Sequence, residues 1–245
     1  MAEGGKTWWL CTEFTDTWVD GTTRPPVAEN EDLKRQAELA FEHAEYRVSR
    51  HQNKFDRIDA ILALKRSMQT RLDHLDELYN LRQYPESKSV GWLGVLESWG
   101  VIRQRMLRRM RQLRNAVEHD GAEPPTIEDC QDYCEVAWWF LRGTAPILTP
   151  ISSLELYFDE GNFWIRVDYN PVRIFATGNI LPEMISDAPV DGWVKVTAIR
   201  DERRGMKGVM TPCSSKEAGK QYMAFLVTDP GEVAPFLRLL FKEFL

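Results

Sequence analysis

The spacing of apolar residues changes twice along the chain, and each change predicts a different kind of structure. Residues 27–84 contain no glycine or proline, and apolar side chains recur at spacings of three and four from Leu33 to Leu78, with Phe55, Ile58 and Leu62 on the stripe expected to be buried. This spacing predicts amphipathic helix, either as one very long helix or as two helices joined near Arg50–Asn53. The pattern drifts out of strict heptad register, which favours a helical bundle over a coiled coil.

The helical pattern continues to about residue 148. After a predicted loop from Tyr84 to Gly91, a short helical stretch is interrupted by Gly94 and Gly100. A further helix carries an apolar stripe and breaks at Asp120-Gly121. The chain then turns at Pro124-Pro125, and Thr126 followed by Glu128 and Asp129 predicts the N-cap of a helix that ends near Gly143 and Pro146. The stripe of the helix before the break consists of Ile102, Met106, Met110, Leu113 and Val117.

Both ends of the chain favour β-structure. Residues 6–20 are rich in aromatic and β-branched side chains, and Asp20-Gly21 is a turn signal, so we expect one strand or a hairpin that can join a sheet elsewhere. Two apolar runs, 154–158 and 163–167, flank Asp-Glu-Gly-Asn and predict a hairpin. Further strands are predicted at 172–176, 193–199 and 222–228, and a last helix is predicted to begin at Asp229-Pro230-Gly231-Glu232.

These patterns predict an α+β protein in three parts. Residues 1–26 form an N-terminal β segment, and residues 27–148 form an antiparallel helical bundle. Residues 149–245 form a smaller α+β domain, in which antiparallel strands pack against a C-terminal helix. A chain of 245 residues with 43% hydrophobic residues is long enough for two packed cores.

Charge and cysteine content narrow the function classes. The net charge is −6, so the whole molecule is not a general nucleic-acid binder. Attraction for RNA must be local, and six arginines fall within the twelve positions from Arg103 to Arg114. The four cysteines have neither the spacing of a disulfide framework nor that of a zinc site, which favours reduced thiols and a cytoplasmic location. No apolar run predicts a membrane span or a secretion signal.

Six residues at the end of the arginine-rich helix, Arg114-Asn115-Ala116-Val117-Glu118-His119, carry the chemistry of RNA cleavage without a metal. A histidine titrates near neutral pH and can take the proton of a ribose 2′-hydroxyl. An arginine is always charged and holds phosphate oxygens with a planar fork. The motif and its position before a loop resemble the HEPN family, all-helical domains of which many are ribonucleases, and the resemblance covers roughly residues 28–148.

The resemblance implies a metal-independent endoribonuclease with no cofactor, in which Arg114, Asn115 and His119 act on RNA and leave a 2′,3′-cyclic phosphate. Relatives of this kind act as prokaryotic toxins or antiviral effectors, so cellular or phage RNA, including tRNA, is the implied substrate. The family also implies a homodimer formed through the helical domain and a regulatory or inhibitory partner protein. The C-terminal domain would then sense a signal or regulate the activity.

Helix geometry does not place Arg114 and His119 on the same side of a straight helix. Five residues turn a helix by about 500°, so His119 lies roughly 140° around the axis from Arg114. Asn115 and His119 share one side of the helix with Arg105, Arg108 and Gln112, whereas Glu118 lies four residues from Arg114 and can hold it. In the family, motifs from two subunits line one cleft, which resolves the mismatch. The predicted RNA-contacting side chains are Arg105, Arg108, Arg111 and Gln112.

Other interpretations of the same residues stay open. The arginine run is also typical of a solvated helix face, and His119 also suits a helix C-terminus. Some HEPN-like domains are non-catalytic modules that bind RNA, nucleotides or a partner protein. A further family role, as the target of a nucleotidyltransferase, is disfavoured because Asp120 and Gly121 stand where that form carries a tyrosine.

Overall fold

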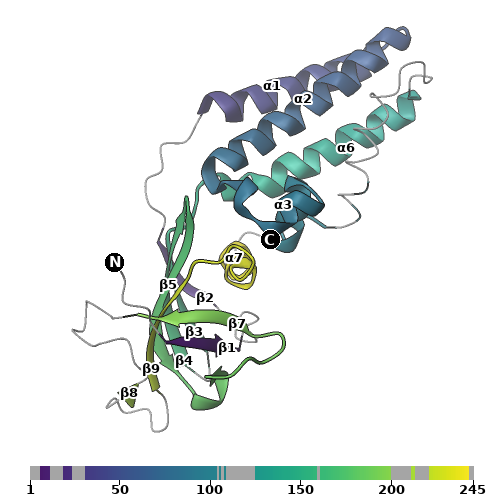
Figure 1. The fold of residues 1–245 in the computed structure, drawn as a ribbon. Helices are drawn as coiled ribbons and strands as arrows, with labels where there is room; N and C mark the ends of the chain where they lie inside the picture. The colour runs from purple at the N-terminus through teal and green to yellow at the C-terminus, as the bar shows by residue number, and fades with distance from the viewer. Residues whose placement is uncertain are drawn as a thin grey trace. The chain divides into compact units, whose positions relative to one another are not determined.

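The computed structural model describes residues 6–11, 19–23, 31–103, 105, 108, 125–158, 161–199, 211–212 and 221–242. The chain divides into two compact units. The helical unit lies within Val27–Thr149, and the β unit combines Met1–Pro26 with Pro150–Glu243. The protein is therefore mixed α+β, as the sequence predicts (Figure 1).

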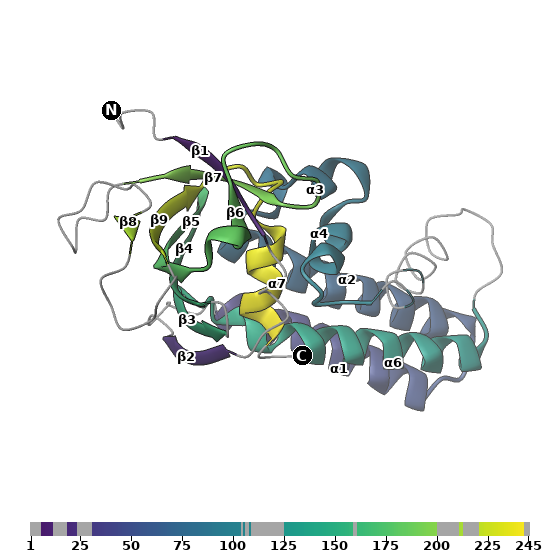
Figure 2. The same cartoon turned by 90° about the horizontal axis from the view of Figure 1, so that it is seen from below.

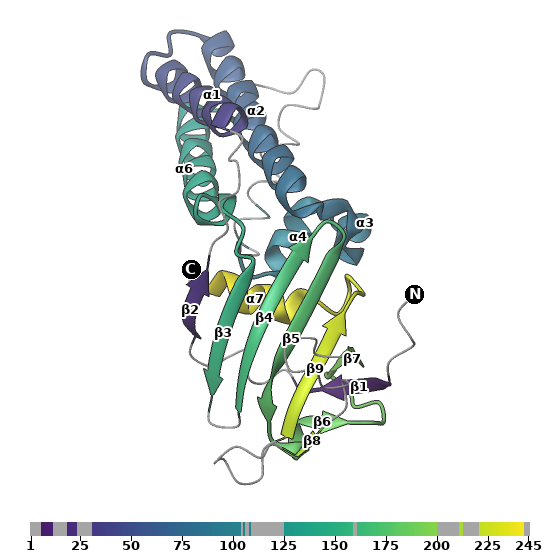
Figure 3. The ribbon, with the colours of Figure 1, turned by 90° about the vertical axis from the view of Figure 1, so that its left-hand side faces the viewer.

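Three long helices lie side by side in the helical unit (Figures 1 and 3). Helices α1 and α2 form an antiparallel pair, and α6 packs against both. Two short helices, α3 and α4, follow α2. The bounds are Glu31–Ser49 for α1, Lys54–Tyr79 for α2, Pro85–Ser89 for α3, Trp92–Ser98 for α4 and Ile127–Thr144 for α6.

The break between α1 and α2 decides between the two predicted alternatives for residues 27–84. Asn53 caps α2, because its side-chain oxygen accepts hydrogen bonds from the amides of Phe55 (2.8 Å) and Asp56 (3.4 Å). In turn, the side-chain carboxylate of Asp56 accepts hydrogen bonds from the amides of Gln52 and Asn53. This capping box satisfies amides that have no partner inside the helix, so the chain forms two helices.

Two predictions for this region are wrong. The stretch after Tyr84 is not all loop, because Pro85 begins the short helix α3 at a position where a proline costs no hydrogen bond. Phe55, Ile58 and Leu62 were expected on the buried stripe but are exposed by 68%, 36% and 46%. The capped restart at Asn53 shifts the helical phase, so that Ala60, Ile61 and Leu64 face the core instead.

The β unit is built on an antiparallel sheet in which nine strands are described (Figures 2 and 3). Along the sheet the order is β2-β3-β4-β5-β9-β7-β1-β6, and β8 also pairs with β9. The strands are β1 Thr7–Leu10, β2 Val19–Thr23, β3 Ser153–Phe158, β4 Gly161–Tyr169, β5 Val172–Ile180, β6 Ile185–Ser186, β7 Val194–Ala198, β8 Thr211–Pro212 and β9 Gln221–Val227.

Strand pairing confirms the predicted hairpin and decides between the alternatives for the N-terminal segment, which joins the sheet without forming a hairpin of its own. Strands β3 and β4 pair in register, with Leu156 opposite Phe163. Strands β1 and β2 do not form a hairpin, since β1 pairs with β6 and β7 while β2 pairs with β3. The expected turn at Asp20-Gly21 lies within β2, where the register shifts between Asp20 and Thr22. A glycine there accommodates a β-bulge as readily as a turn.

One face of the sheet is covered by helix α7, Ala234–Lys242 (Figure 3). The ring of Phe225 contacts the rings of Phe163 at 5.5 Å and of Phe236 on α7 at 6.1 Å between centroids. The helix begins later than predicted. Asp229 instead accepts a hydrogen bond from the amide of Gly231 (2.9 Å) in a turn that precedes α7.

Candidate functional site

The whole predicted catalytic motif, from Arg114 to His119, and part of the predicted RNA-contacting set lie outside the part of the chain that the structure describes. This holds for Arg111, Gln112, Arg114, Asn115, Glu118 and His119. Two of the predicted RNA-contacting residues, Arg105 and Arg108, are described. Both are helical and exposed, and a spacing of three places them on one side of a helix.

Residues 103–126, called the motif segment here because they contain Arg114 to His119, follow a group of tightly packed side chains. Trp99 at the end of α4 is fully buried, and its ring makes edge-to-face contacts with Tyr79 (5.6 Å) and Tyr84 (5.0 Å). Val101 and Ile102 are also buried. Arg103 is the first exposed residue after them.

The chain returns from the motif segment at a capped helix start, as the sequence predicts. The hydroxyl of Thr126 accepts a hydrogen bond from the amide of Asp129 (3.1 Å), and the carboxylate of Asp129 accepts from the amide of Thr126 (3.1 Å). This capping box begins α6 at Ile127. The packed side chains and the capped helix therefore fix both ends of residues 103–126.

The core between α1, α2 and α6 contains a row of buried polar side chains that sequence reasoning missed. Ser67 donates to the carbonyl of Ala37 (2.7 Å). Arg71, only 1% exposed, donates to the carbonyl of Leu141 (3.1 Å) and the hydroxyl of Thr144 (3.2 Å). His74 is fully buried on the same face of α2. Ser67, Arg71 and His74 are spaced so that they lie on one face of α2, the face that also carries Leu64, Met68 and Leu75. This spacing among apolar residues is the sequence signal that identifies them as buried.

Burial changes the chemistry of this row. Removal from water lowers the pKa of Arg71 to about 10, an effect that the charge of Glu38 partly opposes. A guanidinium with that pKa is still charged at neutral pH. One backbone carbonyl and one hydroxyl, rather than a carboxylate, accept its hydrogen bonds, so Arg71 links α2 to the end of α6. Because the row is buried, it is not accessible to a substrate.

The histidines of the helical unit have separate surroundings. His43 lies 3.1 Å from a carboxylate oxygen of Asp59, and His51 lies against the carbonyl of Val48. Arg47 contacts Asp59 at 2.7 Å and Asp56 at 3.4 Å. The amide of Gln52, aided by that of Asn53 and by Arg47, holds the pKa of Asp56 below its ordinary value. Among the described residues, no three histidine, cysteine or acidic side chains lie together as a metal site would require.

The thiols of α6 are protected by the fold. Cys130 is fully buried, and burial raises its pKa. Burial, reinforced by the charge of Glu45, raises the pKa of Cys134 to about 12. A thiol with such a pKa is almost entirely protonated at neutral pH, so neither side chain suits nucleophilic catalysis.

The sheet face opposite α7 carries aromatic and charged side chains. The guanidinium carbon of Arg166 lies 4.4 Å from the centre of the Phe175 ring, which it faces across β4 and β5. Trp164 and Tyr157 belong to the same face by register. At the N-terminal strand, Lys6 stacks on Trp8 at 4.1 Å. Stacked cations and half-buried rings are suited to contact a flat aromatic group.

No family model, curated protein or solved structure matches this chain. In the described part of the chain, no helix combines the length and apolar character needed to cross a bilayer. The case for function therefore depends on the chemistry of the residues themselves.

Proposed function

We propose that this protein is a metal-independent endoribonuclease of the HEPN type. The observation that carries the proposal is the motif Arg114-Asn115-x-x-x-His119 at the end of an arginine-rich segment. Exposed Arg105 and Arg108 before the motif, and the capped start of α6 after it, support the proposal. The packing of α1 antiparallel to α2 and α6, which run in the same direction, is compatible with a helical bundle of this family.

In the proposed reaction, His119 takes the proton from a ribose 2′-hydroxyl, and the 2′-oxygen attacks the adjacent phosphorus. The bond from phosphorus to the 5′-oxygen breaks, and that oxygen takes a proton from water and leaves as a 5′-hydroxyl, while His119 returns its proton to water. Arg114 stabilises the charge that develops on the phosphate oxygens, and Asn115 orients His119 or the phosphate. The product keeps a 2′,3′-cyclic phosphate, and the reaction needs no metal.

The test is cleavage of total RNA by the purified chain in excess chelator, compared with His119→Ala and Arg114→Ala. Loss of a general base or of a phosphate contact should lower the rate at least about 100-fold. His51→Ala and Arg35→Ala are matched controls, because they remove the same residue types outside the motif and should cleave like wild type. Cleavage by both motif variants at the wild-type rate would exclude the assignment of the site.

The family-derived parts of the proposal are tested separately. A homodimer through the helical domain predicts a mass in solution of twice 28.5 kDa. A toxin or antiviral role in the cytoplasm predicts growth arrest on expression, relieved by the His119→Ala variant or by an inhibitory partner protein. The β unit would then sense a signal or regulate cleavage.

A second function, non-catalytic binding of RNA, a nucleotide or a protein, is favoured by one observation. The outward face of the sheet presents the Arg166–Phe175 stack beside Trp164. Such faces bind unstacked bases or partner proteins without chemistry. Binding of RNA that is not cleaved, and that weakens in Arg166→Ala, would favour this function over the first.

A further inference from the structure

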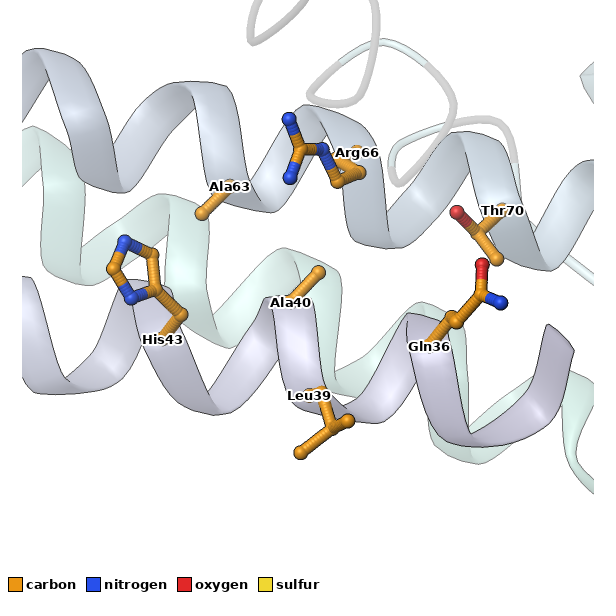
Figure 4. A pocket seen from close by; sticks show the side chains of 7 residues that line it. All are labelled: Gln36, Leu39, Ala40, His43, Ala63, Arg66 and Thr70. Atoms are coloured by element: carbon orange, nitrogen blue, oxygen red, sulfur yellow. The ribbon is translucent and has the colours of Figure 1, made fainter. Parts of the chain in front are cut away.

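A small groove runs between α1 and α2 on the surface of the helical unit (Figure 4). It encloses about 310 Å³. Ala40 on α1 and Ala63 on α2 both line the space between the two helices. Two alanines at these positions leave space that larger side chains would fill. A volume of this size is at the lower end of those that hold small molecules in proteins.

Hydrogen-bond donors surround this α1–α2 groove. Gln36 and Thr70 face one another toward one end, and Arg66 lies between Thr70 and Ala63 on the α2 side (Figure 4). Within the part of the chain that the structure describes, no hydrogen bond or ion pair engages Arg66, Gln36 or Thr70. A guanidinium, an amide and a hydroxyl that line the same groove are therefore free to bind a ligand.

The unengaged state of Arg66 distinguishes it from several other arginines of the helical unit. Arg47 contacts Asp56 and Asp59, Arg71 is bonded within the core, and Arg82 contacts Asp76 at 3.1 Å. Of the described residues that line the groove, none carries a carboxylate. A cation without a counter-charge, next to two neutral donors, favours an anion.

His43 closes the other end of the groove (Figure 4). Its ring contacts Asp59, but that carboxylate is also 2.7 Å from Arg47. The negative charge of Asp59 is thus compensated at the edge of the groove and does not cancel the charge of Arg66.

We propose that the α1–α2 groove binds the phosphate group of a small ligand of up to nucleotide size. Arginine holds two phosphate oxygens with its planar fork, and the Gln36 amide and Thr70 hydroxyl can donate to the same group. Leu39, which is 50% exposed, and the two alanines offer apolar contact to a sugar or base. The free phosphate ion and a nucleotide share this chemistry. The groove includes no residue of the proposed catalytic motif, so the proposal stands apart from RNA cleavage.

The test is isothermal titration of the full chain, carrying His119→Ala, with inorganic phosphate, adenosine 5′-monophosphate and adenosine at constant ionic strength. Both phosphates should bind and adenosine should not. Tighter binding of the nucleotide than of phosphate would identify a nucleotide as the ligand, and equal affinities would identify phosphate itself. Because His119→Ala removes the proposed catalytic base, binding is measured whether or not the wild type cleaves RNA.

Two variants examine the groove by independent means. Arg66→Gln removes the cation and should weaken binding of both phosphates at least tenfold. Ala40→Leu fills the space without changing any charge and should have a similar effect. Arg35→Gln, one position from Gln36 but outside the lining, changes the net charge equally and should bind as before. The proposal is overturned if neither phosphate binds at millimolar concentration, or if binding persists unchanged in both groove variants while circular dichroism shows them folded.

Discussion

The two units of this protein bury different kinds of side chain. Among the described residues, four polar or charged side chains are buried, and all four, Ser67, Arg71, His74 and Thr144, belong to the helical unit. The core of the β unit is built from apolar groups such as those of Phe163, Phe225 and Phe236. An apolar core requires only suitable volume and shape, whereas a buried polar group also requires its hydrogen-bond partner. We therefore expect the two cores to respond differently to substitution.

The largest effect is expected at Arg71. Arg71→Ala leaves a cavity and removes the donor to Leu141 and Thr144, so the free energy of unfolding of the helical unit should fall by about 4 kcal/mol. Arg71→Met keeps most of the volume and removes the buried charge. It should lose less than about 1 kcal/mol, because an apolar replacement of similar size often matches a buried ion in stability.

Urea denaturation followed by circular dichroism measures both variants, and hydrogen exchange locates the change in the helical or the β unit. An equal loss in the two variants would show that the guanidinium hydrogen bonds, rather than side-chain volume, stabilise the packing of α2 on α6. If the Arg71 variants lost hydrogen-exchange protection only in the β unit, the expected difference between the two cores would be wrong.

Local signals explain which elements the sequence could predict. The Thr126 cap depends on residues within one helical turn, and the β3–β4 hairpin depends on two apolar runs that only four residues separate in the sequence. Both were predicted correctly because their interactions are close in sequence. The partners of Arg71 lie 70 and 73 residues away, and periodicity alone does not state which polar residue can be satisfied across that distance.

The second prediction compares one substitution in the two units. A Cβ at Gly178 on β5 would lie 1.8 Å from the carbonyl oxygen of Asn162 and 2.7 Å from the ring of Phe163. Gly178→Ala must therefore displace β4, at a cost of about 3 kcal/mol. At Gly143 on α6, the corresponding Cβ meets nothing nearer than the carbonyl of Val101 at 4.0 Å. Gly143→Ala should stabilise the helical unit by about 1 kcal/mol.

Thermal and urea unfolding of the two glycine variants gives the sign of each effect. Opposite signs are expected, and a stabilised Gly178→Ala variant would mean that β4 and β5 can separate slightly at little cost. Sequence alone could not assign these signs, because both glycines are surrounded by residues that fit their element. The difference arises from the neighbouring strand at Gly178 and from open space at Gly143.

Other errors have a related origin. Asp20-Gly21 is compatible with a turn or a bulge, and only pairing of β2 with β3 selects the bulge. Phe55, Ile58 and Leu62 continue the apolar spacing of α1, but the cap at Asn53 starts a new helix with a different phase. For the candidate site, the sequence identifies the motif chemistry, whereas the free donors of the α1–α2 groove become visible only when α1 and α2 are placed side by side.

A smaller effect is expected at the helix cap next to the motif segment. Thr126→Ala removes the hydroxyl that accepts from the Asp129 amide, so stability should fall by about 1 kcal/mol. Asn53→Ala at the cap of α2 should cost a similar amount and is the matched control. If the proposed function is correct, only Thr126→Ala should also slow RNA cleavage, because it loosens one end of the segment that carries His119. Equal cleavage rates in Thr126→Ala and Asn53→Ala would show that the Thr126 cap does not influence the proposed catalytic site.

The smallest effect at neutral pH belongs to Cys134. Burial raises its pKa from 9.0 to about 12, so the folded state favours the protonated thiol. The stabilisation that follows from the raised pKa is fully present below pH 9 and is lost as the pH rises toward 12. The free energy of unfolding should therefore decline over that range more in wild type than in Cys134→Ala.

At pH 8 the thiolate fraction of Cys134 is about 1000-fold lower than that of a thiol of pKa 9, and alkylation should slow in proportion. Mass spectrometry of each alkylated cysteine measures this rate, and urea should restore it. Fast alkylation of Cys134 in the folded protein would mean that α6 opens locally. The buried hydrogen bond between Arg71 and Thr144 would then stabilise the packing of α6 less than we expect.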